Sequence, residues 1–165
     1  KWAVTGGGIG NQQVTDIVVD NAGNIHVAVL TQNNVLFGTN SYNVVGTQDS
    51  VIVKLSSAGA FQSVTGYGIA NQAVSLTALA VDANGDLYAG GSFEGTMAKN
   101  GWSITANKGG SDLFFIKEGT TPSNQWAATG GSNSADSLQA MDVSSAGELV
   151  FTCLLYTSPS PRDTA

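Results

Sequence analysis

The sequence predicts an all-β protein made of antiparallel four-stranded units, and three observations support this prediction. One pattern of about 62 residues recurs along the chain. In each copy, short runs of β-branched and apolar residues alternate with turns that contain glycine, which is typical of hairpins. No stretch of useful length carries the apolar periodicity of a helix. We therefore expect about two and a half copies of one β unit.

The repeat is clearest in a strand–turn–strand segment. Three segments share its order of apolar, polar and glycine positions: IVVDNAGNIHV at 17–27, LAVDANGDLYA at 79–89 and, more weakly, MDVSSAGELVF at 141–151. The aligned glycines are each 62 residues apart: Gly23, Gly85 and Gly147. A second motif contains Lys54 and Lys117, which are 63 residues apart. Because independent markers keep one period, the repeat is a strong signal.

Two hairpins are expected in each full copy. In the first, the turn includes Gly23 or Gly85, because glycine adopts the left-handed conformation that such turns need. Its expected strands are 14–20 with 25–30, and 74–82 with 87–91. The expected strands of the second hairpin are 50–55 with 60–65, and 113–117 with 125–129. The Gly- and Asn-rich excursions between the hairpins leave room for a further small hairpin; they cover 31–48 and 92–111.

Units of this kind must bury their faces against one another. Radial repetition of a four-stranded unit gives the blades of a β-propeller, whereas linear repetition gives a solenoid. The coils of β-solenoids are usually much shorter than this repeat, so blades are favoured. Propellers have about four to eight blades. We therefore expect residues 1–152 to form an incomplete ring, with the remaining blades in the same full-length chain.

The last thirteen residues differ from the repeat. The run CLLYTSPSPRD at 153–163 reads back into codons that look like a sequencing-library adapter translated in frame. Segments of this kind are set aside before the fold is considered. We expect 153–165 to be an artefactual or disordered tail, and the gene to be cut near Thr152 and before Lys1.

Two ordered sets of residues resemble the SBBP-type β-propeller repeat of bacterial proteins. The first set is Asp112, Lys117, Trp126, Gly130 and Gly131; the second is Val81, Asp82, Gly85, Asp86, Gly91, Ser92, Phe93 and Gly95. The resemblance covers 1–152 and is best in the second copy; the first copy has Leu30-Thr31-Gln32 in place of Gly-Ser-Phe, and the third has Ser144 in place of Asp. It implies a β-propeller fold and a secreted or cell-surface location, but it implies no reaction.

The composition excludes several classes of partner. Six Lys and Arg stand against twelve Asp and Glu, which gives a net charge of −6 at pH 7. Nucleic acids and anionic membrane surfaces are bound through clusters of Lys and Arg, so both are excluded. No run of about 20 apolar residues is present, and we expect no membrane insertion.

Two turn motifs could bind an ion or a phosphate, but their spacing argues against it. The DNAGN and DANGD turns at 20–24 and 82–86 hold oxygen ligands, yet their glycine is at the fourth position and no Glu follows at the twelfth. We expect their Asp side chains to cap their own turns. The segment TGGGIGNQQ at 5–13 precedes a strand and not a helix, so we expect it to connect units. No metal and no cofactor are predicted.

The only histidine, His26, is the first candidate for catalysis. It aligns with Tyr88 and Val150 in the other copies, and this predicts a packing or surface position instead of a Ser-His-Asp site. With one His and no Cys in 1–152, no zinc site is expected.

Carboxylates near one another in sequence could form a glycosidase-like pair. The candidate pairs are Asp112 with Glu118, and Asp136 with Asp142. Asp112 recurs as Asp49 one repeat earlier, which favours a structural role. The sequence therefore assigns no catalytic residue.

Aromatic residues recur as well. Trp2, Phe61 and Trp126 align in the three copies, where they could stack on sugars but are expected to pack between blades. Tyr42 and Trp102 lie in the excursions and are the better candidates for exposed contacts, since loops carry function.

Together these observations predict a non-catalytic β-propeller repeat module of a secreted or cell-surface bacterial protein. We expect it to serve in binding or adhesion through the excursions 31–48 and 92–111, with a protein or a carbohydrate as the ligand. No individual ligand-binding residue is assigned. The alternatives are a fragment of an enzymatic propeller, of lyase or lactonase type, with its site in other blades, or an architectural stalk of tandem repeats.

Overall fold

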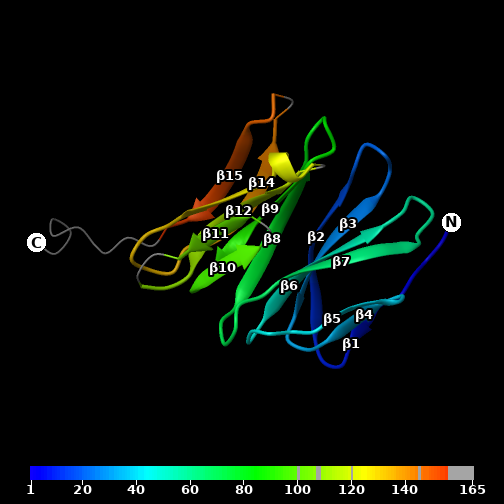
Figure 1. Cartoon of the computed structure of the whole chain (residues 1–165), viewed down its shortest axis with the longest axis horizontal. Coiled ribbons are helices and arrows are strands. Elements are labelled where there is room, and N and C mark those ends of the chain that lie inside the picture. Colours follow the sequence, from blue (N-terminus) through cyan, green and yellow to red (C-terminus); the bar gives the residue numbers. More distant parts are fainter. Residues whose placement is uncertain (100, 107–108, 120, 145, 156–165) are drawn as a thin grey trace, which may run out of the picture.

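The computed structural model describes residues 1–155 except 100, 107–108, 120 and 145, and it is all-β as expected. In the described residues the one helix is a 3₁₀ turn, η1 (Pro122–Asn124). Most of the expected tail, 156–165, lies outside the described residues. The rest forms three main antiparallel sheets and two small ones, which follow one another along the chain (Figure 1).

The first two main sheets are four-stranded and have the same strand order. Sheet one contains β2 (Gln12–Val19), β3 (Ile25–Thr31), β6 (Asp49–Leu55) and β7 (Phe61–Tyr67), in the order β2-β3-β6-β7. Sheet two contains β8 (Val74–Val81), β9 (Leu87–Phe93), β12 (Asp112–Glu118) and β13 (Trp126–Gly130), in the order β8-β9-β12-β13. The two hairpins predicted for each full copy are confirmed.

The third sheet is two-stranded in the described residues. It pairs β14 (Ser137–Val143) with β15 (Leu149–Leu154). Strand β15 does not end at Thr152, the expected end of the repeat, because Cys153 and Leu154 continue it and Cys153 lies opposite Leu138.

The excursions form small hairpins of their own. In the first copy, β4 (Val35–Phe37) pairs with β5 (Asn40–Tyr42) and with β1 (Gly7–Gly8). In the second copy, β10 (Thr96–Lys99) pairs with β11 (Trp102–Thr105). One strand of each small hairpin contacts the last strand of a main sheet: β5 contacts β7, and β11 contacts β13.

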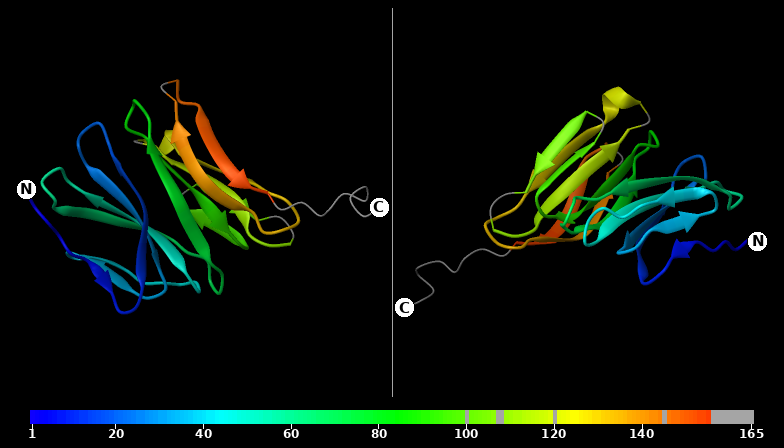
Figure 2. Two further views of the ribbon diagram at one scale, coloured as in Figure 1. Left: turned by 180° about the vertical axis from the view of Figure 1, so that it is seen from behind. Right: turned by 60° about the horizontal axis from the view of Figure 1, so that its bottom comes forward.

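The three main sheets stack face to face, and their first strands, β2, β8 and β14, lie next to one another (Figure 2). Residues one repeat apart therefore touch. The Thr15 hydroxyl donates to the Leu76 carbonyl at 2.8 Å, and the backbone N–H of Leu79 donates to Asp16 at 2.7 Å.

Apolar layers fill the spaces between the sheets. One layer includes Ile52 and Phe114 between sheets one and two, and a second includes Phe115 and Met141 between sheets two and three. On the other face of sheet one, Phe37 of the small hairpin covers part of the strands. Burial of these side chains supplies the main driving force for the stacking.

Candidate ligand-binding cleft between the first two sheets

An aspartate caps the first turn of sheet one. Asp20 Oδ1 accepts hydrogen bonds from the backbone N–H groups of Ala22 at 3.0 Å and Asn24 at 2.8 Å. The other oxygen, Oδ2, lies 3.2 Å from His26 Nε2 and 3.7 Å from Lys54 Nζ. Burial opposes ionisation, but the hydrogen bonds from Asn24 and His26 outweigh it and hold the pKa of Asp20 well below its usual value. The predicted role of this Asp as a turn cap is confirmed.

The second copy repeats the cap with stronger ion pairing. Asp82 Oδ1 accepts from the backbone N–H groups of Asn84 at 2.9 Å and Asp86 at 3.0 Å, and the Tyr88 hydroxyl lies 3.2 Å from Oδ2. Lys117 Nζ is 2.8 Å from Asp86 and 3.6 Å from Asp82. The hydrogen bond with Asp86 raises the pKa of Lys117. The aligned lysines therefore anchor the aligned turns.

His26 is buried, with 7% of its surface exposed, and it lies beside a carboxylate. The sequence predicted a packing or surface position for His26, and the structure shows the packing position. The sequence did not identify Asp20, six residues earlier across the turn, as its partner. Burial lowers the pKa of His26, although the bond with Asp20 opposes the shift. At neutral pH the ring is therefore uncharged and Nε2–H donates to Asp20.

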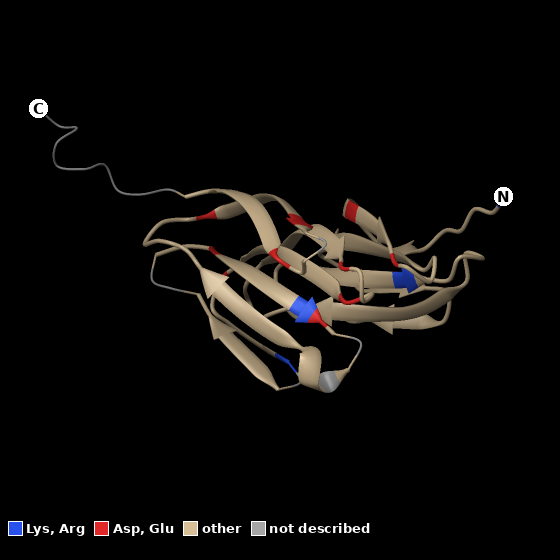
Figure 3. Cartoon of the chain, turned by 90° about the horizontal axis from the view of Figure 1, so that it is seen from above, with Lys and Arg blue, Asp and Glu red and all other residues tan. Residues whose placement is uncertain are grey.

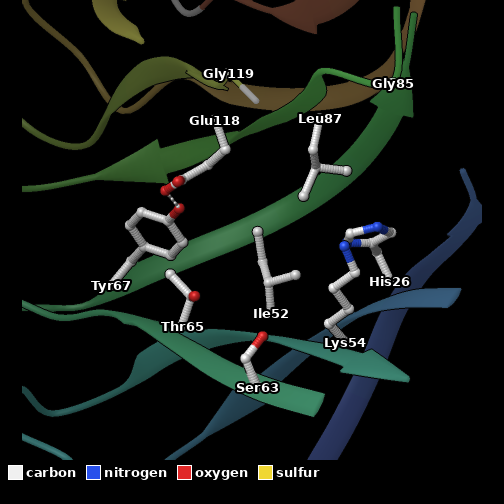
Figure 4. Close-up of a pocket in the computed structure, with 10 residues that line it drawn as sticks. All are labelled: His26, Ile52, Lys54, Ser63, Thr65, Tyr67, Gly85, Leu87, Glu118 and Gly119. Atoms are coloured by element: carbon white, nitrogen blue, oxygen red, sulfur yellow. Dashed lines mark hydrogen bonds between the residues drawn. The ribbon is translucent and has the colours of Figure 1, made fainter. Parts of the chain in front are cut away.

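A cleft of about 200 Å³ lies between sheets one and two, beside His26 (Figure 4). Ile52 of β6 and Leu87 of β9 give it an apolar floor. Its polar walls come from both sheets: His26, Lys54, Ser63 and Thr65 from sheet one, and Glu118 from sheet two. The cleft is thus bounded by side chains from two successive copies of the repeat.

Glu118 is held in place on its side of the cleft. The Tyr67 hydroxyl donates to Glu118 Oε1, and Lys99 Nζ lies 3.3 Å from the same oxygen. The Lys99 ammonium is also 4.3 Å from the centre of the Tyr67 ring. Burial raises the pKa of Tyr67 well above 10, and the charge of Glu118 adds to the shift, so the phenol remains a donor. No sequence pattern indicated this contact between copies.

Two side-chain hydroxyls in the cleft, those of Ser63 and Thr65, make no hydrogen bond to another described residue. They project from the same face of β7 because strand side chains alternate. Lys54 lies opposite Ser63 in the β6–β7 ladder, and 35% of its side chain is exposed. An ammonium, two hydroxyls and a carboxylate therefore surround an apolar floor.

The candidate carboxylate pairs do not assemble. Asp112 and Glu118 stand at the two ends of the seven-residue strand β12. Asp136 immediately precedes β14, and Asp142 lies near the far end of that strand. At about 3.3 Å per residue, Asp112 and Glu118 are roughly 20 Å apart. Figure 3 shows that acidic positions are spread over several strands.

Asp49 has the structural role that its recurrence predicted. Its side chain is fully buried. It accepts hydrogen bonds from the Tyr42 hydroxyl at 2.7 Å and from the backbone N–H groups of Val45 and Gly46 at 2.8 Å and 3.0 Å. Asp49 therefore fixes the end of the first excursion.

The alignment of Trp2, Phe61 and Trp126 is wrong. Trp126 lies opposite Lys117, whereas Phe61 lies opposite Leu55 after a register shift in the β6–β7 ladder. The strand position equivalent to Trp126 is therefore occupied by Ser63, opposite Lys54. Trp2 instead lies over the backbone near Gly59, and its indole N–H donates to the Ser57 carbonyl at 3.1 Å.

The two aromatic residues expected to be exposed contacts are partly buried. Tyr42 packs against the core of sheet one and donates to Asp49, and Trp102 packs against the layer between sheets one and two. Excursion aromatics close the edges of the core because the small hairpins fold back onto the sheets. The expected glycine-rich connection at 5–13 contains β1, which pairs with β4.

Other kinds of site receive no support. In the part of the chain that the structure describes, no group of three or more His, Cys, Asp or Glu side chains is placed to hold a metal ion. No described helix has the length and apolar character needed to cross a membrane. Comparison with protein-family models and with curated proteins found no match.

Proposed function

We propose that this chain is a non-catalytic binding module of a secreted or cell-surface protein, built from β-propeller-type repeats, and that the cleft between its first two sheets binds a carbohydrate unit. The observation that carries the proposal is the pair of unengaged hydroxyls, Ser63 and Thr65, between Lys54 and Glu118 above an apolar floor. The propeller-type arrangement is supported by the side-by-side first strands. The location follows from the resemblance to SBBP-type repeats.

The chemistry of the cleft suits a sugar. Sugar hydroxyls both donate and accept hydrogen bonds, so they can use Ser63 and Thr65 in either sense. Lys54 can only donate and ionised Glu118 can only accept, and both bonds would be strengthened by charge. The C–H groups of a sugar ring would lie over Ile52. A volume of about 200 Å³ is below the range of drug-sized pockets, which favours a single small unit.

Binding is favoured over hydrolysis for a geometric reason. Ser63 and His26 line the same cleft, and Asp20 is bonded to His26, so all three residue types of a triad are nearby. A triad requires the serine to be hydrogen-bonded to the histidine. No such bond joins Ser63 to His26 in the described chain, and His26 Nε2 already contacts Asp20.

The proposal can be tested by NMR titration of the isotopically labelled chain with glucose, glucuronate and, as a control for charge alone, acetate. We expect at least one of the two sugars to shift the amide signals of Ile52, Thr65 and Glu118. Thr65→Val should weaken binding by about 2- to 10-fold, since one hydrogen bond contributes about 0.5–1.5 kcal/mol. Ser63→Trp, which copies the residue of the second sheet, should block the cleft and abolish binding.

Ser41→Ala is the matched control, because Ser41 is an exposed hydroxyl on β5 away from the cleft lining. It should leave the affinity unchanged. If neither sugar perturbs the cleft signals at millimolar concentration, or if Ser63→Trp binds as well as the parent chain, the proposed function is wrong.

A further inference from the structure

The cleft between sheets one and two has opposite charges at its two ends. Along β7, Ser63, Thr65 and Tyr67 all line the cleft, because every second side chain of a strand faces the same way. Lys54 lies opposite Ser63 in the ladder, whereas Glu118 is bonded to the Tyr67 hydroxyl. At about 3.3 Å per residue, Ser63 and Tyr67 are roughly 13 Å apart along the strand. Figure 4 shows Lys54 and Glu118 on opposite sides of the cleft.

The carboxylate of Glu118 already has a counter-charge. Lys99 Nζ lies 3.3 Å from Glu118 Oε1, and the Tyr67 hydroxyl donates to the same oxygen. Lys99 is itself held over the Tyr67 ring, 4.3 Å from its centre, by a cation–π contact. A cationic ligand would have to compete with an ammonium that is in place. This end of the cleft therefore does not select a positive charge.

The ammonium of Lys54 is compensated only in part. In the part of the chain that the structure describes, its Nζ makes no hydrogen bond, and it pairs with one carboxylate, that of Asp20, at 3.7 Å. That distance is longer than a hydrogen bond. The oxygens of Asp20 also accept from the backbone N–H groups of Ala22 and Asn24, and from the side chains of Asn24 and His26. The N–H donors of Lys54 are thus available to a ligand.

Two donors stand side by side at this cationic end. Side chains directly opposite in a ladder have Cβ atoms about 4.5–5.5 Å apart, so the Lys54 ammonium and the Ser63 hydroxyl can reach one small group. An ammonium and a hydroxyl match the two oxygens of a carboxylate, and the bond from the ammonium is strengthened by charge. A phosphate monoester fits less well, because it would bring three oxygens and a charge of up to about −2 close to Asp20.

We propose that the cleft selects a carboxylated sugar, a single uronic acid unit, whose carboxylate is bound by Lys54 and Ser63. The sugar ring then lies over Ile52, with a ring hydroxyl at Thr65, which is opposite Ile52 in the ladder. This preference rests on the proposed carbohydrate function, to which it adds the charge and the orientation of the ligand. Lys54 is the residue that determines the specificity.

Two ligands of the same shape separate the effect of charge. Glucuronate and glucuronamide share the ring and its hydroxyls and differ in a carboxylate against a neutral amide. In NMR titrations at pH 7 and low salt, glucuronate should bind about 3- to 10-fold more tightly. Added sodium chloride should reduce this ratio, because salt screens the ion pair. Acetate has the charge without the ring and should bind more weakly than glucuronate.

Three variants locate the preference. Lys54→Met should bring the ratio of the two affinities close to one, whereas Lys54→Arg, which keeps the charge, should retain a preference for glucuronate. Lys1→Met is the matched control, because it removes the same charge from an exposed residue that does not line the cleft. It should leave the ratio unchanged. Circular dichroism would check that all three variants remain folded.

The outcomes separate the acid preference from the carbohydrate function. Equal affinities of glucuronate and glucuronamide for the parent chain would overturn the preference and leave sugar binding intact. The preference is also wrong if Lys1→Met lowers the ratio as much as Lys54→Met does, or if acetate binds as tightly as glucuronate. If neither sugar ligand shifts the amide signals of Ile52, Thr65 and Glu118, both the preference and the proposed function fail.

Discussion

Sheets one and two each have a turn cluster at the same place in the repeat, and the two clusters hold their lysines differently. The cluster of sheet one contains Asp20 and Lys54, and that of sheet two contains Asp82, Asp86 and Lys117. In sheet one, Lys54 meets a single carboxylate, Asp20, at 3.7 Å, and 35% of the lysine side chain is exposed. In sheet two, Lys117 meets Asp82 and Asp86, the latter at 2.8 Å, and only 10% of its side chain is exposed. The same sequence position therefore holds a partly solvated ion pair in one copy and a buried charge network in the next.

The side chains that lie over the two clusters differ as well. In sheet two, Trp126 packs edge-on against Tyr88, with ring centres 6.2 Å apart. In sheet one, the equivalent positions hold Ser63 and His26, and the space that an indole would fill is part of the cleft. Repeated residues thus fix the turn and its lysine, whereas the residues that differ between copies decide whether the site is covered or open.

The largest expected difference between the clusters is in stability. Lys117→Met keeps the apolar stem but removes the charge that compensates Asp86, which is fully buried. Removing one partner of a buried ion pair costs about 3–5 kcal/mol. The matched variant Lys54→Met should cost less than about 1 kcal/mol, because its pair is partly solvated. Urea unfolding followed by circular dichroism measures both free energies of unfolding.

Similar losses in the two variants would show that the clusters are energetically equivalent despite their geometry. A double variant gives a second check. Because the two lysines lie in separate clusters, their effects should add, whereas a large deviation from additivity would mean that the clusters are coupled through the stacked sheets.

The features that the sequence predicted correctly, the strands, the turns and their Asp caps, are those that depend on residues close together in the chain. The strands and turns followed from apolar runs punctuated by Gly23 and Gly85, whose φ angles of 79° and 84° lie in the left-handed region. The Asp caps followed from side chains that bond their own turn. Both features depend on residues within a few positions of one another, so a single copy of the repeat contains the information.

The cleft could not be predicted because it depends on register and on contacts between copies. The register shift between Lys54 and Leu55 places Ser63 opposite Lys54, as Trp126 is opposite Lys117. Aligning Phe61 with Trp126 in the sequence concealed the equivalence of Ser63 and Trp126. Glu118 lines the cleft and is held there by the hydroxyl of Tyr67, which is 51 residues earlier in the chain. Neither the bulge nor the sheet-to-sheet contact has a local sequence signature.

A smaller difference between the clusters should be seen in the pH dependence of stability. Burial lowers the pKa of His26 from its ordinary value of 6.5. Above that value the ring is neutral in both the folded and the unfolded chain. As the pH falls below it, the unfolded chain takes up the proton more readily, so stability is lost. The lowered pKa of Asp20 acts in the same direction, but only near pH 4 and below.

We therefore expect His26→Tyr, which copies sheet two, to lose less stability than the parent chain between pH 7.5 and pH 5. His26→Gln is the second variant, since it cannot titrate and is smaller than tyrosine. Urea midpoints measured at a series of pH values would give the comparison. If the parent chain and both variants follow the same pH profile, the buried histidine does not distinguish the clusters.

The third copy extends the comparison and gives the smallest expected effect. Ser144 stands where the other turns have Asp, and its hydroxyl accepts one hydrogen bond, from the Glu148 backbone N–H at 3.1 Å. Ser144→Asp would offer the Ala146 and Glu148 N–H groups the shared acceptor that Asp20 provides in sheet one. The new charge lies near Glu148, so the repulsion offsets much of the gain. We expect a stabilisation of less than about 1 kcal/mol in urea unfolding at pH 7, lost again when the carboxylate is protonated. A destabilised variant would mean that repulsion from Glu148 outweighs the added hydrogen-bond acceptor, and that an aspartate cap in this repeat depends on the charges around its turn.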